Sequence, residues 1–400
     1  MISSFLGTNL VLGLRWRYNP PFVNMTCSFK HHERSLWMKS LSISIGLAVL
    51  ICCFSCTVHA AETEITYPEA VRRTDLGLEF LQKSYSNRTG LWRGTGWWNS
   101  ANVLTAIVRY SKFTGEKTYL PIIENTFKNA PNRFPGFINE YYDDEGWWAL
   151  AWVEAFELTD KKEYLDEAEK IFADMCTGWS DELGGGIFWK KGEQYKNSIA
   201  NNLFTLLALR LNAHRPETKV QGETYLAWAE KDWKWYSESG QINREIWMIE
   251  DGLRPNGQPN RNQHWTYNQG VAIAVMVEFY KLKKDKELLD MAEKIADSTI
   301  KRLSRDGILR ERNEPNAGAD GCQFKGIFMR HLYTLYEVSK KAEYRDFIEN
   351  NSDSIWKHRN PETNGFSVSW GSVEEVLHSG TQSSALEALI ALVGILKEEE

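Results

Sequence analysis

Residues 267–294 read YNQGVAIAVMVEFYKLKKDKELLDMAEK and contain the unit from which the rest of the chain is built. Residues 271–279 are apolar almost all round, which is typical of a helix that is buried on every side. After a short charged turn, residues 288–300 place apolar side chains at i, i+3 and i+4 among charged ones. That spacing predicts an amphipathic helix covering one face of a core, so the unit is a hairpin of an inner and an outer helix.

Similar hairpins recur from about residue 66 to the end of the chain. The inner helices are expected to begin near Trp98, Trp147, Ser198, Tyr267, Phe324 and Ser383. An outer helix at about 66–84 precedes them, and the last inner helix covers about 380–397. Because that last helix can pair with the first outer one, we predict an all-α (α/α)6 toroid of six inner and six outer helices. An open solenoid is the alternative, although solenoids normally have more uniform repeats and polar capping units.

The composition is that of a globular protein and disfavours nucleic acid as a partner. The 400 residues are 42% hydrophobic and 25% charged, the formal net charge is −6, and the body of the chain has no basic block. Seventeen residues are Trp. Because the indole ring combines a flat apolar face with an N–H donor, this content suits sugar binding, but helical cores can also be packed with Trp.

Residues 1–60 are predicted to lie outside the folded body. Residues 1–37 show no sustained period, whereas Met38 and Lys39 are followed by an apolar stretch and by small residues at 58–61. This pattern is typical of a secretory signal peptide. We therefore predict an upstream extension at 1–37, a signal peptide at 38–60 and a single (α/α)6 domain at 61–400. The protein would be secreted, periplasmic or at the cell surface, without stable membrane insertion after cleavage. A membrane anchor or a lipoprotein ending at Cys56 are the alternatives.

Cysteine and histidine usage predicts neither a metal nor a cofactor. Only Cys176 and Cys322 lie beyond the N-terminal segment. They could pair in an oxidising compartment, but the sequence does not establish that they do. No Cys/His cluster has the spacing of a metal site, so the hydrophobic core alone must stabilise the fold. We expect a monomer.

The loops that lead into the inner helices differ from those at the opposite ends. Loops such as 92–98, 184–189 and 262–268 are rich in Gly, Asn and aromatic residues, whereas 283–286 is short and charged. The starts of the inner helices share one rim of a closed ring. We therefore predict that the functional groups gather on that rim.

A run of acids opens the second inner helix, where residues 139–152 read NEYYDDEGWWALAW. Acids in a first turn complement the helix dipole, and Asp is a favoured N-cap, so Asp143 and Asp144 could serve as caps. Glycosidic cleavage, however, needs one carboxyl to protonate the leaving oxygen and a second as nucleophile or base. The surrounding Tyr and Trp residues favour this second interpretation. Adjacent residues can reach the separation for either retention or inversion.

The local environment suggests a role for each acid. Asp143, nearer the cap, is expected to be held ionised by backbone N–H groups and to act as the nucleophile. Asp144 is expected to have a raised pKa, through burial against Trp or through the neighbouring negative charge, and to act as the acid/base.

The string YYDDEGWW at 141–148 resembles the signature of glycoside hydrolase family 76, the endo-α-1,6-mannanases. The similarity runs from about residue 66 to the C-terminus in matching order. The resemblance implies an (α/α)6 barrel and retaining hydrolysis of α-1,6-linked mannose backbones by this adjacent Asp pair, with no obligatory metal. Further similar strings lie at 184–187, 195–198, 265–270 and 324–328.

Other residues at the starts of the inner helices are predicted to bind the α-mannan substrate. Amide groups can hold sugar hydroxyls with paired donor and acceptor bonds, although each could equally be a helix cap. A polar loop containing Arg310, Arg312, Asp320 and Gln323 could line the cleft or be solvated. The predicted contacts are Trp98, Asn99, Asn102, Tyr142, Trp147, Asn201, Asn202, Tyr267, Asn268, Gln269, Lys325 and Gln382.

Two other functions remain open at this point. A non-catalytic exported glycan-binding protein could use the same repeats, but it has no use for paired acids. A cell-wall mannan transglycosylase of the same fold would usually have a C-terminal lipid-anchor signal. The chain ends in ILKEEE without a hydrophobic tail, which favours hydrolysis.

Overall fold

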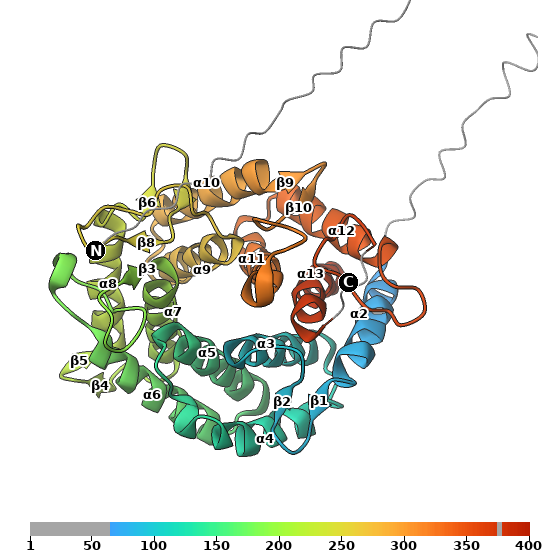
Figure 1. Ribbon diagram of the computed structural model, residues 1–400, viewed down its shortest axis with the longest axis horizontal. Coiled ribbons are helices and arrows are strands. Elements are labelled where there is room, and N and C mark those ends of the chain that lie inside the picture. The colour runs from blue at the N-terminus through green and yellow to red at the C-terminus, as the bar shows by residue number, and fades with distance from the viewer. Residues whose placement is uncertain (1–64, 374–377) are drawn as a thin grey trace, which may run out of the picture. The chain divides into compact units, whose positions relative to one another are not determined.

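The computed structural model describes residues 65–373 and 378–400, in which twelve α-helices alternate between an inner and an outer ring (Figure 1). The inner helices are α3 (Trp97–Thr114), α5 (Tyr142–Thr159), α7 (Ser198–His214), α9 (Thr266–Lys283), α11 (Gly318–Ser339) and α13 (Ser379–Glu399). The outer helices are α2 (Tyr67–Gln82), α4 (Leu120–Asn129), α6 (Lys162–Met175), α8 (Tyr225–Glu238), α10 (Lys286–Leu303) and α12 (Ala342–Lys357). The predicted toroid of six inner and six outer helices is confirmed.

The ring closes through its last and first helices. The inner helix α13 packs against the outer helix α2 and also against its inner neighbours α3 and α11. In Figure 1 the red α13 accordingly lies beside the blue α2. Because the two ends of the repeat array contact each other, the array is a closed ring and not an open solenoid.

The turn from inner to outer helix is built in the same way in four of the hairpins. The inner helix ends where a residue adopts the left-handed conformation, with φ between 51° and 75°, and its N–H is donated back to the last turn. This geometry stops a helix within one residue, so the chain can turn at once toward the outer helix. The four residues are Gly115, Asp160, Lys284 and Lys340.

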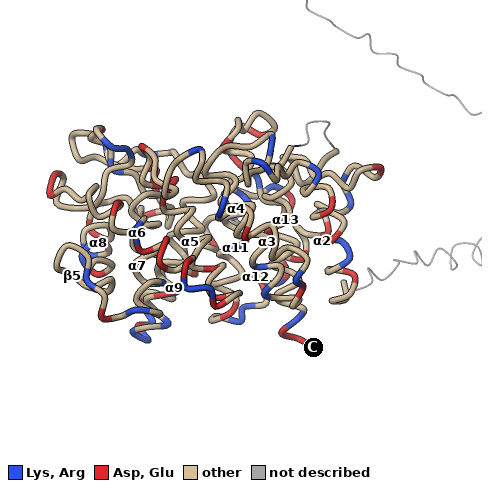
Figure 2. The backbone as a smooth tube through the Cα atoms, turned by 90° about the horizontal axis from the view of Figure 1, so that it is seen from below, with Lys and Arg blue, Asp and Glu red and all other residues tan. Residues whose placement is uncertain are grey.

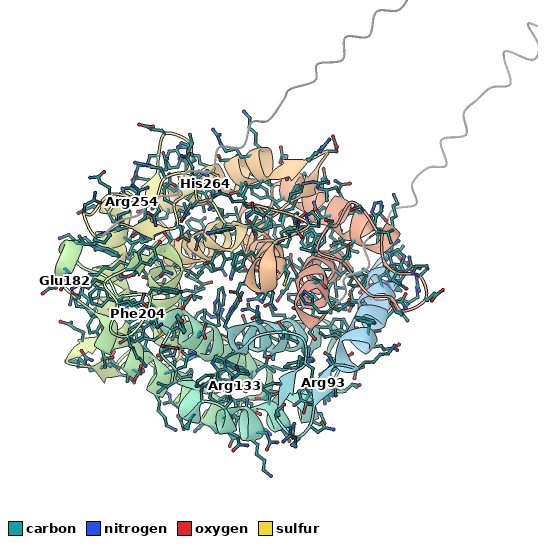
Figure 3. All side chains as sticks on the ribbon, viewed as in Figure 1. Arg93, Arg133, Glu182, Phe204, Arg254 and His264 are labelled. Atoms are coloured by element: carbon teal, nitrogen blue, oxygen red, sulfur yellow. The ribbon has the colours of Figure 1, made fainter. Side chains whose placement is uncertain are left out.

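The hydrophobic core lies between the two rings, and side chains fill this space (Figure 3). Phe204 of α7 stacks on Phe172 of α6 with ring centroids 4.9 Å apart. The inner helix α13 is buried nearly throughout and, among the described residues, is the one helix long and apolar enough to span a membrane. An inner helix contacts protein on every side, which accounts for its apolar composition.

Short antiparallel strand pairs and 3-10 turns shape the loops. The strand pairs are β1 (Tyr85–Ser86) with β2 (Leu91–Trp92), β3 (Lys196–Asn197) with β8 (Gly252–Leu253), β4 (Lys219–Val220) with β5 (Glu223–Thr224), β6 (Ile242–Asn243) with β7 (Met248–Ile249), and β9 (Ser304–Arg305) with β10 (Ile308–Leu309). The 3-10 turns are η1 (Ala130–Asn132), η2 (Pro135–Phe137), η3 (Cys176–Gly178) and η4 (Glu182–Gly184). In the β3–β8 pair, Asn197 lies opposite Gly252, which joins the start of α7 to a distant loop.

The two rims of the ring differ, as Figure 2 shows in side view. Long loops form one rim, where the inner helices begin. Short turns form the other rim, on which the C-terminus lies. The short turns belong to the far ends of the inner helices, so the rim with long loops is the one that has room for a site.

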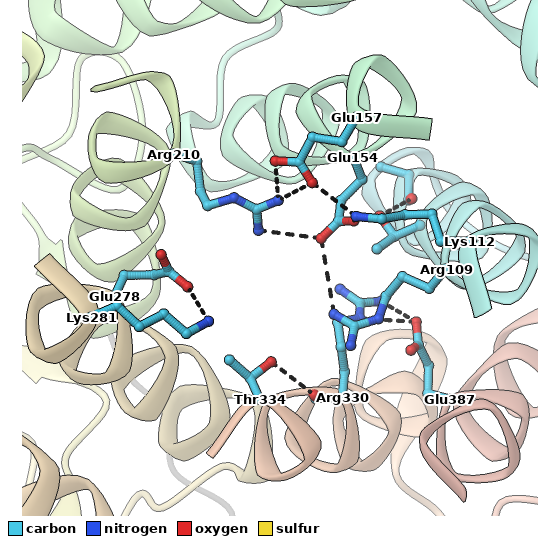
Figure 4. A network of polar contacts seen from close by, with 12 residues as sticks. Arg109, Lys112, Glu154, Glu157, Arg210, Glu278, Lys281, Arg330, Thr334 and Glu387 are labelled. Atoms are coloured by element: carbon cyan, nitrogen blue, oxygen red, sulfur yellow. Dashed lines mark hydrogen bonds and ion pairs between the residues drawn. The ribbon is translucent and has the colours of Figure 1, made fainter. Parts of the chain in front are cut away.

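Toward the far rim, a network of ion pairs crosses the inside of the ring (Figure 4). Lys112 bonds Glu154 at 2.9 Å and Glu157 at 2.8 Å, and Arg210 bonds the same two carboxylates at 3.3 and 2.7 Å. Burial opposes ionisation of Glu154, but Arg210, Lys112 and Arg109 outweigh it and hold the pKa of this carboxyl well below its usual range. Three inner helices are thereby joined by charge pairing at this end.

Two expectations from the sequence concern other parts of the chain. Cys176 and Cys322 are both free and buried, so the disulfide that the sequence left open is not formed. The predicted extension at 1–37 and signal peptide at 38–60 lie outside the described residues. Residues Glu64–Glu400 form one compact unit.

Candidate active site

The two predicted acids lie in the first turn of α5 and are not its cap. The N-cap is Tyr141, whose backbone is extended (φ −114°, ψ 118°) and whose side chain makes no capping bond. The helix begins at Tyr142, so Asp143 and Asp144 are its second and third residues. Neither carboxyl therefore caps the helix, and both are available for other contacts.

Both carboxyls line a cavity of about 490 Å³ at the rim with the long loops. Its walls come from the first turns of α3, α5, α9 and α11 and from the loops before α5, α7 and α9. The volume lies within the usual range for small-molecule sites. The lining residues are Trp98, Tyr141, Asp143, Asp144, Trp147, Trp189, Tyr195, Asn197, Asp251, Tyr267, Asp320 and Phe324.

Each catalytic candidate is held by one side-chain donor. Trp189 donates its indole N–H to Oδ2 of Asp143 at 3.0 Å. Asn139 donates its amide N–H to Oδ2 of Asp144 at 2.7 Å. The other oxygen of Asp143, Oδ1, is buried and has no hydrogen-bond partner among the described residues. Trp189 thus fixes one oxygen of Asp143, while the other has no partner in the described part of the protein.

Burial raises the pKa of both carboxyls. The pKa of Asp143 is well above its ordinary value because of burial and then the charge of Asp144, partly opposed by Trp189 and by the backbone N–H groups of both residues. Burial raises the pKa of Asp144 to about 7, against the bond from Asn139. The predicted effect of backbone N–H groups on Asp143 is present, but burial outweighs it. Two like charges this close cannot both form easily, so ionisation of one carboxyl opposes ionisation of the other.

Stacked aromatic rings form one wall of the cavity. Trp98 stacks on Trp147 with centroids 5.8 Å apart, and Tyr267 stacks on Phe324 at 3.9 Å with an angle of 6° between the planes. Trp98 donates its indole N–H to Asp320 at 2.9 Å. Such flat apolar surfaces suit the C–H faces of sugar rings, while the carboxylate of Asp320 can accept bonds from hydroxyls.

A second wall is polar and centres on Asp251. Tyr195 donates its hydroxyl to Oδ2 of Asp251 at 2.6 Å, and Asn268 donates its amide to Oδ1 at 3.3 Å. Burial raises the pKa of Asp251. The β3–β8 pairing places this carboxyl beside Asn197. The cavity therefore contains four carboxyl groups, and no Lys or Arg is among the residues that line it.

Five of the predicted site residues line this cavity: Asp143, Asp144, Trp98, Trp147 and Tyr267. Tyr142 does not line it, although its two neighbours do. The ring of Tyr142 packs against Gly178, and its hydroxyl lies 3.1 Å from that of Thr177. The helix turn sends Tyr142 outward, away from the side that carries the acids. Asn268 reaches the cavity only through Asp251.

The predicted amides Asn201, Gln269 and Gln382 have a different use from sugar binding. Each accepts a hydrogen bond at 2.7 Å from the backbone N–H of a loop residue: Ile187, Ile249 and Phe366, respectively. All three amides are fully buried. Because buried backbone groups need partners, an inner helix that carries such an amide fastens the rim loop packed beside it. This arrangement corrects their assignment as substrate contacts.

The remaining predicted contacts are also occupied within the protein. Asn99 donates to Gln323 at 2.7 Å, and Asn102 and Asn202 donate to backbone oxygens four residues earlier. The ammonium of Lys325 is fully buried, where it donates to Val368 O at 2.6 Å and pairs with Glu314 at 2.5 Å. None of these four residues lines the cavity. They stabilise the rim from within.

Seven residues that line the cavity were not among the predicted contacts: Tyr141, Trp189, Tyr195, Asn197, Asp251, Asp320 and Phe324. Trp189 follows the Gly-rich string at 184–187, and Tyr195 begins the string at 195–198. Nothing in the spacing of these strings shows that their loop folds over α5. Asp251 belongs to no motif and reaches the site only through pairing of β8 with β3. Asp320, which the sequence left open as cleft-lining or solvated, does line the cavity. No group of His, Cys, Asp or Glu within residues 65–373 and 378–400 is arranged to hold a metal ion.

The fold and the site together are those of a helical-barrel glycosidase, with a buried carboxyl pair facing stacked aromatic rings. The chain matches the model of glycosyl hydrolase family 76 over residues 75–397 and belongs to that family. The family membership that the YYDDEGWW string suggested is thereby confirmed, and the match extends over most of the chain. The protein is a glycoside hydrolase.

Two curated relatives come from a fungus. The chain is 25% identical over 329 residues to mannan endo-1,6-alpha-mannosidase DFG5 of Candida albicans, which covers 74% of this chain and 72% of that protein. It is 26% identical over 263 residues to the mannan endo-1,6-alpha-mannosidase DCW1 of the same species. That match covers 59% of this chain and 57% of that protein. The match to DCW1 thus spans less than two thirds of its length.

Solved structures share the fold over most of the chain. The Lin0763 protein of Listeria innocua has a TM-score of 0.75 and 28% identity and covers 83% of this chain and 98% of that chain. The GH76A α-1,6-mannanase of Salegentibacter sp. HEL1_6 has a TM-score of 0.74 and 24% identity and covers 82% and 99%, respectively.

Proposed function

We propose that this chain is an exported, endo-acting hydrolase that cleaves α-1,6-mannosidic linkages in mannan backbones with retention of anomeric configuration. The observation that carries the proposal is the placement of Asp143 and Asp144 together in one aromatic-walled cavity. The names of the fungal relatives support the substrate class. Structures of inactive Salegentibacter variants, in which two consecutive aspartates were replaced, contain α-1,6-mannotriose and α-1,6-mannotetrose.

The two carboxyls would act in two steps. In the first, the free Oδ1 of Asp143 attacks the anomeric carbon while Asp144 gives its proton to the departing glycosidic oxygen. The C–O bond breaks, and a covalent glycosyl-Asp143 ester forms. In the second, Asp144, now ionised, takes a proton from water, and the water oxygen displaces Asp143. The indole N–H of Trp189 stabilises the Asp143 carboxylate as it leaves. After the first step the negative charge lies on Asp144, and after the second step it is back on Asp143.

The cavity walls support a neutral sugar as substrate. Four carboxyl groups without a lining Lys or Arg would repel a polyanion such as nucleic acid. The stacked Trp98 and Trp147 can support sugar rings on either side of the scissile bond. Residues 38–60, which read as a signal peptide, support export, and we expect the mature protein to act as a monomer.

Hydrolysis of linear α-1,6-mannooligosaccharides by purified wild type, Asp143→Asn and Asp144→Asn tests the proposal. Loss of general acid/base help alone costs about 10²–10⁴-fold, so each variant should lose at least that much turnover while keeping its helical circular dichroism. Asp346→Asn, which replaces an exposed carboxyl on α12, is the matched control and should keep full activity.

The products distinguish the remaining functions. NMR of the first-formed product should show the α-anomer, whereas the β-anomer would overturn retention. Internal cleavage of long chains supports endo action, and release of single mannose units contradicts it. Products longer than the substrate indicate a transglycosylase. Binding without any cleavage by wild type would leave only a glycan-binding protein.

A further inference from the structure

A second cavity, of about 550 Å³, lies on the same sector of the ring as the start of α3. Its walls come from the β1–β2 hairpin, the loop that leads into α3, and the end of α4 with η1. It is somewhat larger than the cavity that holds Asp143 and Asp144, and nothing in the proposed reaction uses it. In Figure 3, its residues Arg93 and Arg133 both lie on this sector of the ring.

The two cavities have opposite charge. Three arginines, Arg88, Arg93 and Arg133, line the second cavity, and no acidic residue does. None of the three forms an ion pair with a carboxylate in the described part of the chain. Arg93 donates one N–H to the backbone oxygen of Lys83 at 2.9 Å, and Arg133 lies 5.5 Å from the ring of Phe134. Several guanidinium N–H donors therefore remain available, in the geometry that binds planar and tetrahedral oxyanions.

Two further polar atoms of this cavity's lining residues are without partners. Trp92 is 2% exposed, and its indole nitrogen has no hydrogen-bond partner among the described residues; the same holds for the hydroxyl of Thr95. Native proteins seldom leave buried polar groups unpaired, so each such group calls for an explanation. Both residues belong to the wall of the second cavity, and the protein alone does not satisfy all polar groups of that wall.

The second cavity adjoins the catalytic pair. Gly96 and Ser100 line the second cavity, while Trp98 of the same helix start lines the first. The first turn of α3 thus separates the two cavities. Arg133 lies close enough to Asp144 for its charge to act on that carboxyl. A glycan bound across this rim can therefore reach both cavities at once.

We propose that the second cavity is a subsite for a hexose that carries an oxyanion, such as a phosphorylated mannose on a branch of the mannan chain. The identity of the sugar rests on the proposed function, whereas the charge of the ligand rests on the three arginines. An acidic branch would be selected here, while the neutral backbone enters the carboxyl-lined cavity. The structure thereby assigns branch recognition to the β1–β2 hairpin and the end of α4.

Calorimetric titration of the full chain with mannose 6-phosphate, glucuronate, mannose and inorganic phosphate tests this subsite. We expect the two charged sugars to bind at least tenfold more tightly than mannose, and the stronger of them identifies the oxyanion. The Arg88→Gln/Arg93→Gln double variant should lose most of this preference, because two of the three guanidinium groups that line the cavity are removed. Arg244→Gln, at an exposed position outside both cavities, should retain it.

Hydrolysis of neutral linear α-1,6-mannooligosaccharide is measured in parallel. The double variant should cut it at the wild-type rate, because neither arginine lines the catalytic cavity. Equal affinity for mannose and mannose 6-phosphate would overturn the subsite, and so would inorganic phosphate that binds as tightly as the charged sugars. A wild type that binds mannose 6-phosphate but cuts no mannan would contradict only the proposed function.

Discussion

At the scale of single residues, Asp143 and Asp144 owe their chemistry to their surroundings. An exposed Asp is ionised at neutral pH, since its ordinary pKa is about 3.9. In the cavity, burial raises both pKa values, and the charge of Asp144 raises that of Asp143 further. Trp189 and Asn139 then bond one residue each, so the two adjacent side chains have different partners. These different partners support the proposal that one acts as the nucleophile and the other as the acid.

Trp189→Phe should reduce turnover while preserving the aromatic wall. The change removes only the N–H that holds Oδ2 of Asp143. A hydrogen bond to a charged group contributes about 1.5–3 kcal/mol, so we expect kcat to fall about 10- to 100-fold. Trp179→Phe is the control, because that indole N–H bonds Asp181 outside the cavity. Equal losses in both variants would show that the bond to Asp143 has no special role.

The pH dependence of kcat/KM should report the proton on Asp144. The acid must be protonated to act, and its pKa is about 7, so activity should fall as pH rises through about 7. Asn139→Ala removes a bond that lowers this pKa. The alkaline limb of the profile should therefore move to higher pH in the variant. An unchanged or lower limb in a stopped assay across pH 4–10 would contradict this role of Asn139.

At the scale of elements, the rim loops are positioned by the helices and strands beneath them. Lys196 in β3 is fully buried and donates to the backbone oxygens of Ser180 at 2.7 Å and Gly185 at 2.5 Å. Burial lowers the pKa of this ammonium to about 8. Asn201 of α7 fastens the same loop at Ile187. This loop leads directly to Trp189, so one buried cation and one amide position the partner of Asp143.

Gly186→Ala should destabilise the protein far more than Gly192→Ala. Both glycines have a left-handed backbone, with φ +85° and +81°. An added Cβ at Gly186 would lie 2.2 Å from the ring of Trp235, whereas at Gly192 nothing lies within 4 Å. The backbone cost of about 1–2 kcal/mol is common to both, and overpacking adds about 1–3 kcal/mol or more at Gly186. Urea unfolding measures the difference, and equal midpoints would contradict it.

At the scale of the whole molecule, the ring separates chemistry from stability. The rim where the inner helices begin has the two cavities of opposite charge. Toward the opposite rim, the inside of the ring has the ion-pair network of Glu154, Glu157, Lys112 and Arg210 (Figure 4). A closed ring has no free end, so each inner helix contacts two inner neighbours.

Glu157→Gln should lower the free energy of unfolding at neutral pH and should make that free energy less dependent on pH in the acid range. Burial opposes ionisation, but Arg210 and Lys112 outweigh it and lower the pKa of Glu157 to about 2. The ionised group therefore stabilises the fold above pH 4.5 and loses that effect as pH falls toward 2. The contribution is at most about 3 kcal/mol.

Urea unfolding from pH 7 to pH 2.5 measures this effect. The unfolding free energies of wild type and Glu157→Gln should converge as pH falls. Glu230→Gln, which breaks an exposed pair with Lys283, should change stability by less than about 1 kcal/mol at any pH. A constant gap between wild type and Glu157→Gln would show that Glu157 is not ionised in the folded state.

The local pattern of residues determined the hairpins, their number and the acid pair. Apolar periodicity reports whether a helix is covered on one side or on all sides, so the spacing of apolar residues is enough to distinguish 271–279 from 288–300. The position of Asp143 and Asp144 at the start of an inner helix followed from the same count. Helix geometry is local, and therefore sequence spacing is sufficient to predict it.

Only the tertiary structure decided which polar residues meet in the cavity. Asn201, Gln269 and Gln382 read as sugar contacts, yet packing turns them onto loop backbone that would otherwise be unpaired. Asp251 enters the site because β8 pairs with β3, a contact between segments more than 50 residues apart. Which partner a buried polar group takes depends on distant backbone that needs a bond, and spacing along the chain carries no information about it.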